Sequence, residues 1–239
     1  MSADAVLQVR DLRFRWPQAD ADCLDIPALD LHRGDLVLLR GPSGSGKSSL
    51  LSLLAGVLLP RHGQVRLLGQ DWQALPPSAR DRLRADHVGY IFQQFNLLTY
   101  RSALDNVLLP CSFSRRRAER AKRPRERAAE LLARMGLDEA DWRRRADELS
   151  VGQQQRVAAA RALIGAPELI VADEPTSALD EDHRDRFMAL LLQACREAGS
   201  TLLFVSHDAR LGRHFSRTLD LPSLNLARAS APRPERRRA

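Results

Sequence analysis

The spacing of hydrophobic and polar residues predicts strands and helices that alternate along most of the chain. Apolar or alternating runs typical of strands occur at residues 6–16, 36–40, 64–68, 88–92, 169–172 and 201–205. Helical spacing of apolar residues predicts helices at residues 48–57, from about residue 153, and at residues 181–198. Strands that alternate with helices favour an α/β fold whose sheet is mostly parallel.

The middle of the chain has a different pattern. Residues 103–148 form charged helical sequence without strand signals, and breaks are expected at Pro110, Pro124 and Gly136. This shift predicts a helical subdomain, at about residues 95–150, inserted into a single domain of residues 1–226. Residues 227–239 are rich in proline, arginine and alanine, so we expect a disordered basic tail.

Composition excludes several classes of protein. The 239 residues are 44% hydrophobic and 28% charged, as in soluble globular proteins. The formal net charge is +7, but the arginines are mixed with acidic residues, which favours solvated helix faces, and we expect no nucleic-acid partner. The start of the chain lacks the pattern of a signal peptide, and its longest apolar stretch is too short to span a bilayer. We therefore expect a cytosolic protein, whose three separated cysteines are free thiols.

The segment GPSGSGKSS, residues 41–49, carries the first chemical motif. It fits G-x-x-x-x-G-K-[ST], with a predicted strand before it and a helix after it. Backbone N–H groups that converge on phosphate oxygens need glycine in the loop and a helix N-terminus behind it. Lys47 would neutralise the β- and γ-phosphates of ATP, and the Ser48 hydroxyl would ligate Mg²⁺. The other residues expected to contact the nucleotide are Gly41, Pro42, Ser43, Gly44, Ser45, Gly46 and Ser49. A surface turn of small residues is the alternative, and the strand–loop–helix context disfavours it.

A second motif ends the apolar run at residues 169–172. Asp173 and Glu174 follow that run, and the carboxyl ends of parallel strands form the edge where α/β folds bind ligands. Asp173 is therefore expected in the Mg²⁺ shell, and Glu174 is expected to orient and deprotonate the water that attacks the γ-phosphate. Capping of the next helix by the two acids is the alternative, which the neighbouring phosphate loop makes less favourable.

Together these motifs resemble the nucleotide-binding domains of ABC transporters, over about residues 6–221. The most specific element is LSVGQQQRV, residues 149–157, which is similar to the ABC signature and its helix. The resemblance implies that Ser150 and the N–H of Gly152, with Gln153 beside them, contact the γ-phosphate of a nucleotide held by a second copy. Val151 stands where the signature has a glycine, and its β-branched side chain restricts the backbone. We expect the site to remain competent, with altered dimer geometry or slower turnover as the consequence to test.

The resemblance implies four further site residues. Trp16 would stack on adenine, with Phe14 as the fallback and a core role open for either residue. Gln93 would reach Mg²⁺ and the attacking water, Asp180 would line the facing site, and His207 would hydrogen-bond the γ-phosphate. The fold implied is a phosphate-loop NTPase core with a mostly parallel sheet, an antiparallel β subdomain and the inserted helical subdomain.

The function implied is ATP hydrolysis by a head-to-tail homodimer that drives a separate integral membrane permease subunit. The chain would lie on the cytoplasmic face of the inner membrane, held there by that subunit. Residues 92–98 resemble the lipoprotein-release and macrolide-export group, which implies an exporter or mechanotransmission complex. Its membrane subunits are of the four-helix type with a large periplasmic domain. Phe95, Leu97 and Leu98 would seat the coupling helix of the partner or be buried.

Two alternatives have different partners. A regulatory ABC ATPase would control a membrane partner in cell-envelope or division processes rather than transport. A soluble ABC ATPase that acts on nucleic acid or ribosomes generally carries two ATPase domains or a long coiled-coil insertion, and neither is found in this sequence. The motifs do not identify the cargo or the direction of transport.

Overall fold

Two sheets form the framework of the protein in the computed structural model, which describes residues 5–177 and 179–227. An antiparallel sheet has the strand order β2-β1-β4-β5, and a parallel sheet has the order β6-β7-β8-β3-β9. The antiparallel strands are β1 (Ala5–Phe14), β2 (Leu24–His32), β4 (His62–Leu67) and β5 (Gln70–Asp71). The parallel strands are β3 (Leu36–Arg40), β6 (Val88–Ile91), β7 (Leu169–Asp173), β8 (Thr201–Ser206) and β9 (Arg217–Asp220).

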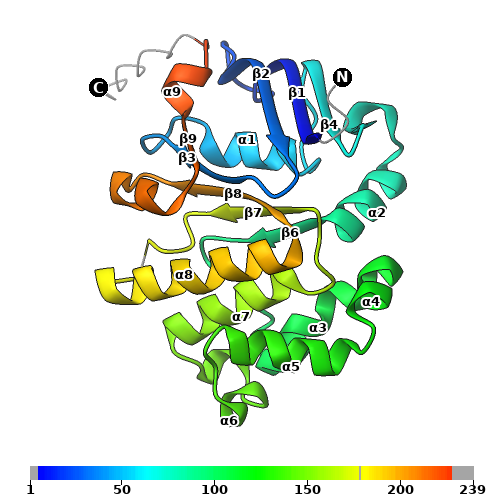
Figure 1. The fold of residues 1–239 in the computed structure, drawn as a ribbon. Coiled ribbons are helices and arrows are strands. Elements are labelled where there is room, and N and C mark those ends of the chain that lie inside the picture. The colour runs from blue at the N-terminus through cyan, green and yellow to red at the C-terminus, as the bar shows by residue number, and fades with distance from the viewer. Residues whose placement is uncertain (1–4, 178, 228–239) are drawn as a thin grey trace, which may run out of the picture.

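Helices cover both faces of the parallel sheet. Helix α1 lies between the two sheets, and α7 and α8 lie under the opposite face, with α3, α5 and α6 further out (Figure 1). The α-helices are α1 (Lys47–Leu54), α2 (Pro77–His87), α3 (Ala103–Phe113), α4 (Arg115–Ala121), α5 (Pro124–Arg134), α6 (Glu139–Trp142), α7 (Val151–Leu163), α8 (Glu181–Ala198) and α9 (Leu221–Leu224). The 3₁₀ segments are η1 (Trp72–Ala74), η2 (Ala146–Glu148) and η3 (Ala209–His214). In the described ranges, no helix is both long enough and apolar enough to cross a membrane.

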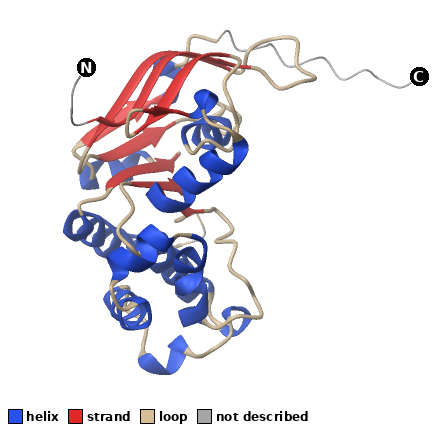
Figure 2. Ribbon diagram, turned by 90° about the vertical axis from the view of Figure 1, so that its right-hand side faces the viewer, coloured by secondary structure: helices blue, strands red, loops and turns tan. Residues whose placement is uncertain are grey.

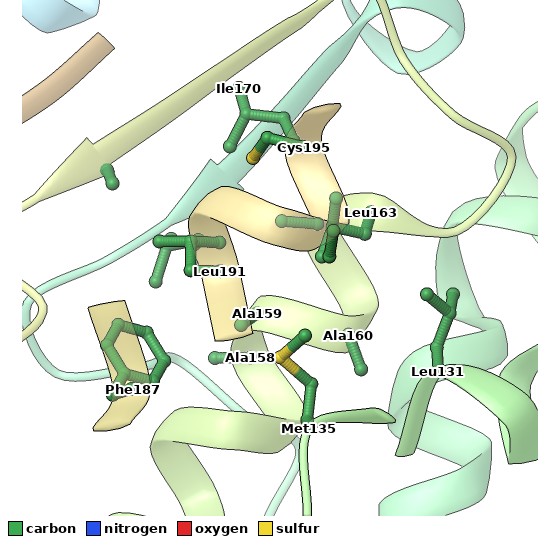
Figure 3. Close-up of a cluster of buried hydrophobic side chains, with 14 of the residues drawn as sticks. Leu131, Met135, Ala158, Ala159, Ala160, Leu163, Ile170, Phe187, Leu191 and Cys195 are labelled. Atoms are coloured by element: carbon green, nitrogen blue, oxygen red, sulfur yellow. The ribbon is translucent and has the colours of Figure 1, made fainter. Parts of the chain in front are cut away.

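The parallel sheet separates two hydrophobic cores. Successive side chains of a strand point to opposite faces, so Leu202 and Phe204 of β8 face one core while Leu203 and Val205 face the other. The first core is filled by small and apolar side chains of α7 and α8 together with α3 and α5, part of which Figure 3 shows. The second packs the leucines of α1 between the sheets. The separation of sheets and outer helices is visible from the side in Figure 2. This arrangement confirms the predicted α/β class with its antiparallel sheet and additional helices.

Three elements escape the sequence pattern for physical reasons. Strand β2 contains Pro27 and two acidic residues, and proline is tolerated there because β2 lies at the edge of its sheet. Helix α2 buries only Leu83, so its sequence carries no apolar period. Strand β9 lies at the edge of the parallel sheet and none of its residues is buried.

One predicted helix break is wrong. Pro110 lies inside α3, whose last residue is Phe113, so the missing N–H affects only the end of that helix. The breaks at Pro124 and Gly136 are confirmed, because Pro124 begins α5 and Gly136 follows it with a φ of +75°. Of the tail predicted to be disordered, residues 228–239 lie outside the described residues.

Candidate functional site

The loop between β3 and α1 has the features of a phosphate-binding loop. Gly46 immediately precedes α1 with a φ of +94°, and a Cβ there would lie 2.9 Å from a methyl carbon of Leu24. A Cβ on Gly41 would lie 2.7 Å from the Ser45 hydroxyl, which is buried and has no hydrogen-bond partner among the described residues. The N-cap of α1 is Gly46, which has no side chain to cap the helix. The N–H groups of its first turn are therefore available to an anion, with the positive end of the helix dipole behind them.

Lys47 is the buried cation of this loop. Its Nζ donates to the carbonyl oxygens of Gly41 and Pro42, both at 2.9 Å, and lies 3.1 Å from Oε1 of Glu174. Only 8% of the side chain is exposed. The three acceptors match the three donors of an ammonium group, so loop and carboxylate together compensate the buried charge.

The two acids after β7 face this loop. Ser48 Oγ donates to Asp173 Oδ2 at 3.1 Å, and this joins the start of α1 to the end of β7. Burial raises the pKa of Asp173, and the hydrogen bond from Ser48 opposes that effect. No cluster of three or more His, Cys, Asp or Glu side chains suited to a metal occurs in residues 5–177 and 179–227. One carboxylate and one hydroxyl still fit Mg²⁺, which is usually bound through one or two carboxylates together with substrate phosphates.

Glu174 stands at the centre of the site in a strained backbone conformation. Its φ is +44°, which is uncommon for a residue with a side chain, and its N–H donates to the carbonyl oxygen of Val205 in β8 at 3.0 Å. Lys47 lies near one carboxylate oxygen, and Nδ1 of His207 lies 3.0 Å from the other. His207 follows β8 directly and its side chain is 63% exposed. The carboxylate is thus held between a buried cation and an accessible imidazole.

The remaining predicted residues lie outside this cluster. Gln93 is exposed in the loop after β6, and no hydrogen bond joins it to Ser48, Asp173 or Glu174. Trp16 is 47% exposed beyond β1 and packs edge-on against Phe14. Phe14 is buried core, which leaves Trp16 as the aromatic that is able to stack on a ligand.

The predicted signature begins α7. Ser150 is its N-cap and forms a capping box with Gln153, at 3.3 Å and 2.9 Å. Gly152 has no positive φ, and a Cβ there would meet nothing within 4 Å. Val151 is 53% exposed. In the described part of the chain, no hydrogen bond or ion pair connects these residues to the Lys47 site, so any role of the signature in that chemistry needs a second copy.

Two further predictions concern loops. Asp180 caps α8 by accepting from the N–H of His183 at 3.0 Å, and that bond lowers the pKa of Asp180. Phe95 is buried, whereas Leu97 and Leu98 are half-buried, so Phe95 belongs to the core. Asp208 is not among the residues that the sequence pattern singles out, although an aspartate between a strand end and a turn is a recognisable capping signal.

The fold and the cluster of Lys47, Ser48, Asp173 and Glu174 define a phosphate-loop ATPase. The family described as ABC transporter matches residues 24–177. The chain therefore belongs to the ABC transporter family, whose predicted ATP-binding and ATP-hydrolysing function is confirmed at that level.

Several known proteins are similar over most of the chain. The macrolide export ATP-binding/permease protein MacB of Photorhabdus laumondii is 37% identical over 91% of this chain. The chain spans about a third of that relative, 33%. The uncharacterised ABC transporter ATP-binding protein YbbA of Escherichia coli K12 is 39% identical, over 92% of this chain and 96% of its own length. A dimeric post-hydrolysis structure of the ATP-binding cassette MJ0796, bound to ADP and Pi, has a TM-score of 0.78 at 33% identity and covers 90% of this chain and 93% of its own.

Proposed function

We propose that this chain is the ATP-hydrolysing subunit of an ABC transporter, which works as a head-to-tail homodimer and drives a separate integral membrane subunit. The observation that supports this function best is the convergence of three contacts at one edge of the parallel sheet. They join Ser48 to Asp173, Lys47 to Glu174, and His207 to Glu174.

Binding of ATP would rearrange the contacts of Lys47. The triphosphate lies along residues 41–49, where the N–H groups of the loop and of the first turn of α1 receive its oxygens. Lys47 exchanges its contacts with the loop carbonyls and with Glu174 for the β- and γ-phosphates. Once Lys47 has moved to the phosphates, the carboxylate oxygen of Glu174 that it contacted is free to accept a proton from water.

Hydrolysis then requires a base beside the γ-phosphate. Glu174 accepts a proton from a water molecule as the water oxygen bonds to the γ-phosphorus, and the bond to the β–γ bridging oxygen breaks, so that ADP retains the electron pair. Lys47 and His207 stabilise the charge that spreads over the phosphoryl oxygens. Ser48 and Asp173, with Gln93 as a predicted further contact, would hold Mg²⁺, which neutralises phosphate charge when bound.

The second half of each pocket is assigned to the other copy. Ser150, Gly152 and Gln153 begin α7 at an exposed helix end, and Asp180 is also exposed. Their lack of contacts to the Lys47 site within the described residues supports a role across an interface, as does the dimeric assembly of the similar cassette MJ0796. Trp16 is assigned to the adenine ring because about half of its side chain is exposed, at 47%.

The membrane partner is assigned from resemblance. Similarity to MacB, whose name joins an ATP-binding part to a permease, supports an exporter or mechanotransmission complex at the cytoplasmic face of the inner membrane. The proposed partner is a permease subunit of the four-helix type with a large periplasmic domain. Co-purification from membranes in mild detergent tests this assignment. Stoichiometric recovery of an integral membrane protein that raises the ATPase rate supports it, and recovery of the chain with no such protein contradicts it.

Glu174→Gln tests the catalytic assignment. The amide keeps the shape of the side chain but cannot accept the proton. An ATP-bound dimer of this variant should therefore accumulate when Mg²⁺ and ATP are added, and native mass spectrometry measures it. Lys47→Ala should bind and hydrolyse ATP poorly and remain monomeric. The exposed Glu119→Gln on α4 is the matched control and should turn over ATP normally. Normal turnover in Glu174→Gln would reject Glu174 as the base.

A further inference from the structure

A buried arginine connects α8 to the segment that carries His207. Arg184 lies one turn inside α8, and its Nη1 donates to Oδ2 of Asp208, the residue after His207, at 3.0 Å. Only 8% of the Arg184 side chain and 19% of the Asp208 side chain are exposed. Water therefore screens this ion pair weakly, and the contact couples the two segments more strongly than a surface pair would.

Asp208 fixes the local backbone around His207. Its Oδ1 accepts from the backbone N–H of Arg210 at 3.0 Å, which caps η3, and its own N–H donates to Ser206 Oγ at 3.1 Å. The hydrogen bonds from Arg210 are the main reason why the pKa of Asp208 lies at about 2, so the carboxylate stays charged across the physiological range. Both neighbours of His207 are thus held, while the imidazole itself reaches Glu174.

Stability alone does not account for an arginine at position 184. Its Nε and Nη2 are buried and form no hydrogen bond in the described ranges, although Nη2 lies 3.4 Å from a Glu181 oxygen. Replacing both members of a buried ion pair by apolar residues of similar volume often costs no stability, so the pair itself is weak evidence for a stabilising role. The ion pair of Asp185 with Arg213, which also joins α8 to η3, is largely exposed and contributes little.

We propose that Arg184 is a positioning residue for ATP hydrolysis. Through Asp208 it sets the backbone of residues 206–208, and this places Nδ1 of His207 against Glu174. This inference rests on the role in hydrolysis proposed for His207. Asp180 is the N-cap of the same helix, so the contact between Arg184 and Asp208 also makes the position of His207 depend on the segment assigned to the facing site.

Arg184→Met tests the proposal in the full-length chain. Methionine fills much of the volume, and Asp208 keeps Arg210, so the thermal midpoint should stay close to that of the wild type. A misplacement of about 1 Å costs up to about a hundredfold in rate, so we expect kcat to fall about tenfold with KM for ATP unchanged within about twofold. Arg184→Lys should restore part of the rate, because it keeps the charge. Arg213→Met, which removes only an exposed pair to the same turn, should behave as the wild type.

A second measurement separates positioning from a general structural effect. The imidazole resonance of His207, assigned by its loss in His207→Ala, should move in Arg184→Met toward its position in Glu174→Gln, where the contact with the carboxylate is weakened. Wild-type kcat in Arg184→Met, or a resonance that does not move, overturns the role of Arg184. If His207→Ala itself retains wild-type kcat, the role proposed for His207 has failed instead.

Discussion

Glu168 offers a stability prediction whose size follows from its contacts. This acid precedes β7, and its side chain is 7% exposed. One carboxylate oxygen lies 2.8 Å from Nδ1 of His87, and the other accepts hydrogen bonds from the guanidinium groups of Arg116 and Arg120, both at 2.7 Å. His87 ends α2 and the arginines belong to α4, so one carboxylate joins three parts of the chain. Burial opposes ionisation of Glu168, but the hydrogen bonds and charges of these partners outweigh it and lower its pKa from 4.5 to about 2.

The pKa of Glu168 sets the size and the pH dependence of the effect. Each pKa unit corresponds to about 1.4 kcal/mol, so the charged carboxylate stabilises the folded state by about 3 kcal/mol at pH 7. Since the folded pKa is the lower one, this stabilisation is complete above pH 4.5 or so and is lost as the pH falls toward about 2. Glu168→Gln should therefore lower the free energy of unfolding by about 3 kcal/mol at pH 7. The difference from the wild type should shrink by about 1 kcal/mol at pH 4 and about 2 kcal/mol at pH 3.

Urea unfolding followed by circular dichroism at several pH values measures this difference. Glu130→Gln is the control. Within the described residues Glu130 pairs only with Arg127, and its side chain is 58% exposed, so the substitution should cost less than about 1 kcal/mol at every pH. A loss in Glu168→Gln that is equally small, or one that does not change between pH 7 and pH 3, would refute the assignment of this carboxylate as a charged anchor of α4.

Three further predictions concern single side chains. Gly56→Ala should lower the free energy of unfolding, measured in urea, by about 2–4 kcal/mol, because Gly56 has a φ of +68° and a Cβ there would lie 2.5 Å from the buried Trp72 ring. Gly69→Ala is the control and should lose only about 1 kcal/mol, because Gly69 has a φ of +77° but a Cβ there would meet nothing within 4 Å. Gly152→Ala should leave the isolated chain as stable or up to about 1 kcal/mol more stable, yet lower ATP turnover at least about tenfold; normal turnover would remove the reason for glycine at this position. Trp16→Ala should weaken ATP binding, measured by equilibrium dialysis, by about five- to a hundredfold if the ring stacks on adenine, and Trp16→Phe should retain most of the affinity.

The parts of the site that follow strands were predictable from the sequence. Lys47 and Ser48 come after β3, Asp173 ends β7 with Glu174 directly behind it, and His207 follows β8. The parallel pairing of these strands brings all five residues to one edge of the sheet. Each motif has its chemical residues at fixed offsets from an apolar run, and the run determines where the strand ends. This link between the hydrophobic pattern and the strand ends explains why these residues lie together in the structure although they are far apart in sequence.

What the sequence does not reveal depends on conformation and pairing. The positive φ of Glu174 and its ion pair with Lys47 have no local signal, because they arise from β8 and the loop after β3 acting together. Trp16 and Phe14 lie in the same alternating run, so only their exposure in the folded chain distinguishes them. The burial of Arg184 could not be predicted from the sequence, for a different reason. A charged residue near the start of a helix is normally solvated, and only the tertiary structure buries this one.

The glycines differ in whether contacts within their own chain require the absence of a side chain. Gly46 and Gly56 have positive φ and face Leu24 and Trp72 so closely that a Cβ cannot be accommodated without movement. Gly152 has neither property. It occupies the first turn of α7 at a cost of up to about 1 kcal/mol relative to alanine, and its Cα faces open space. Nothing in the described part of its own chain requires glycine there, so the role proposed for Gly152 depends on a body that approaches the start of α7. A phosphate bound to the loop of a second copy meets that description.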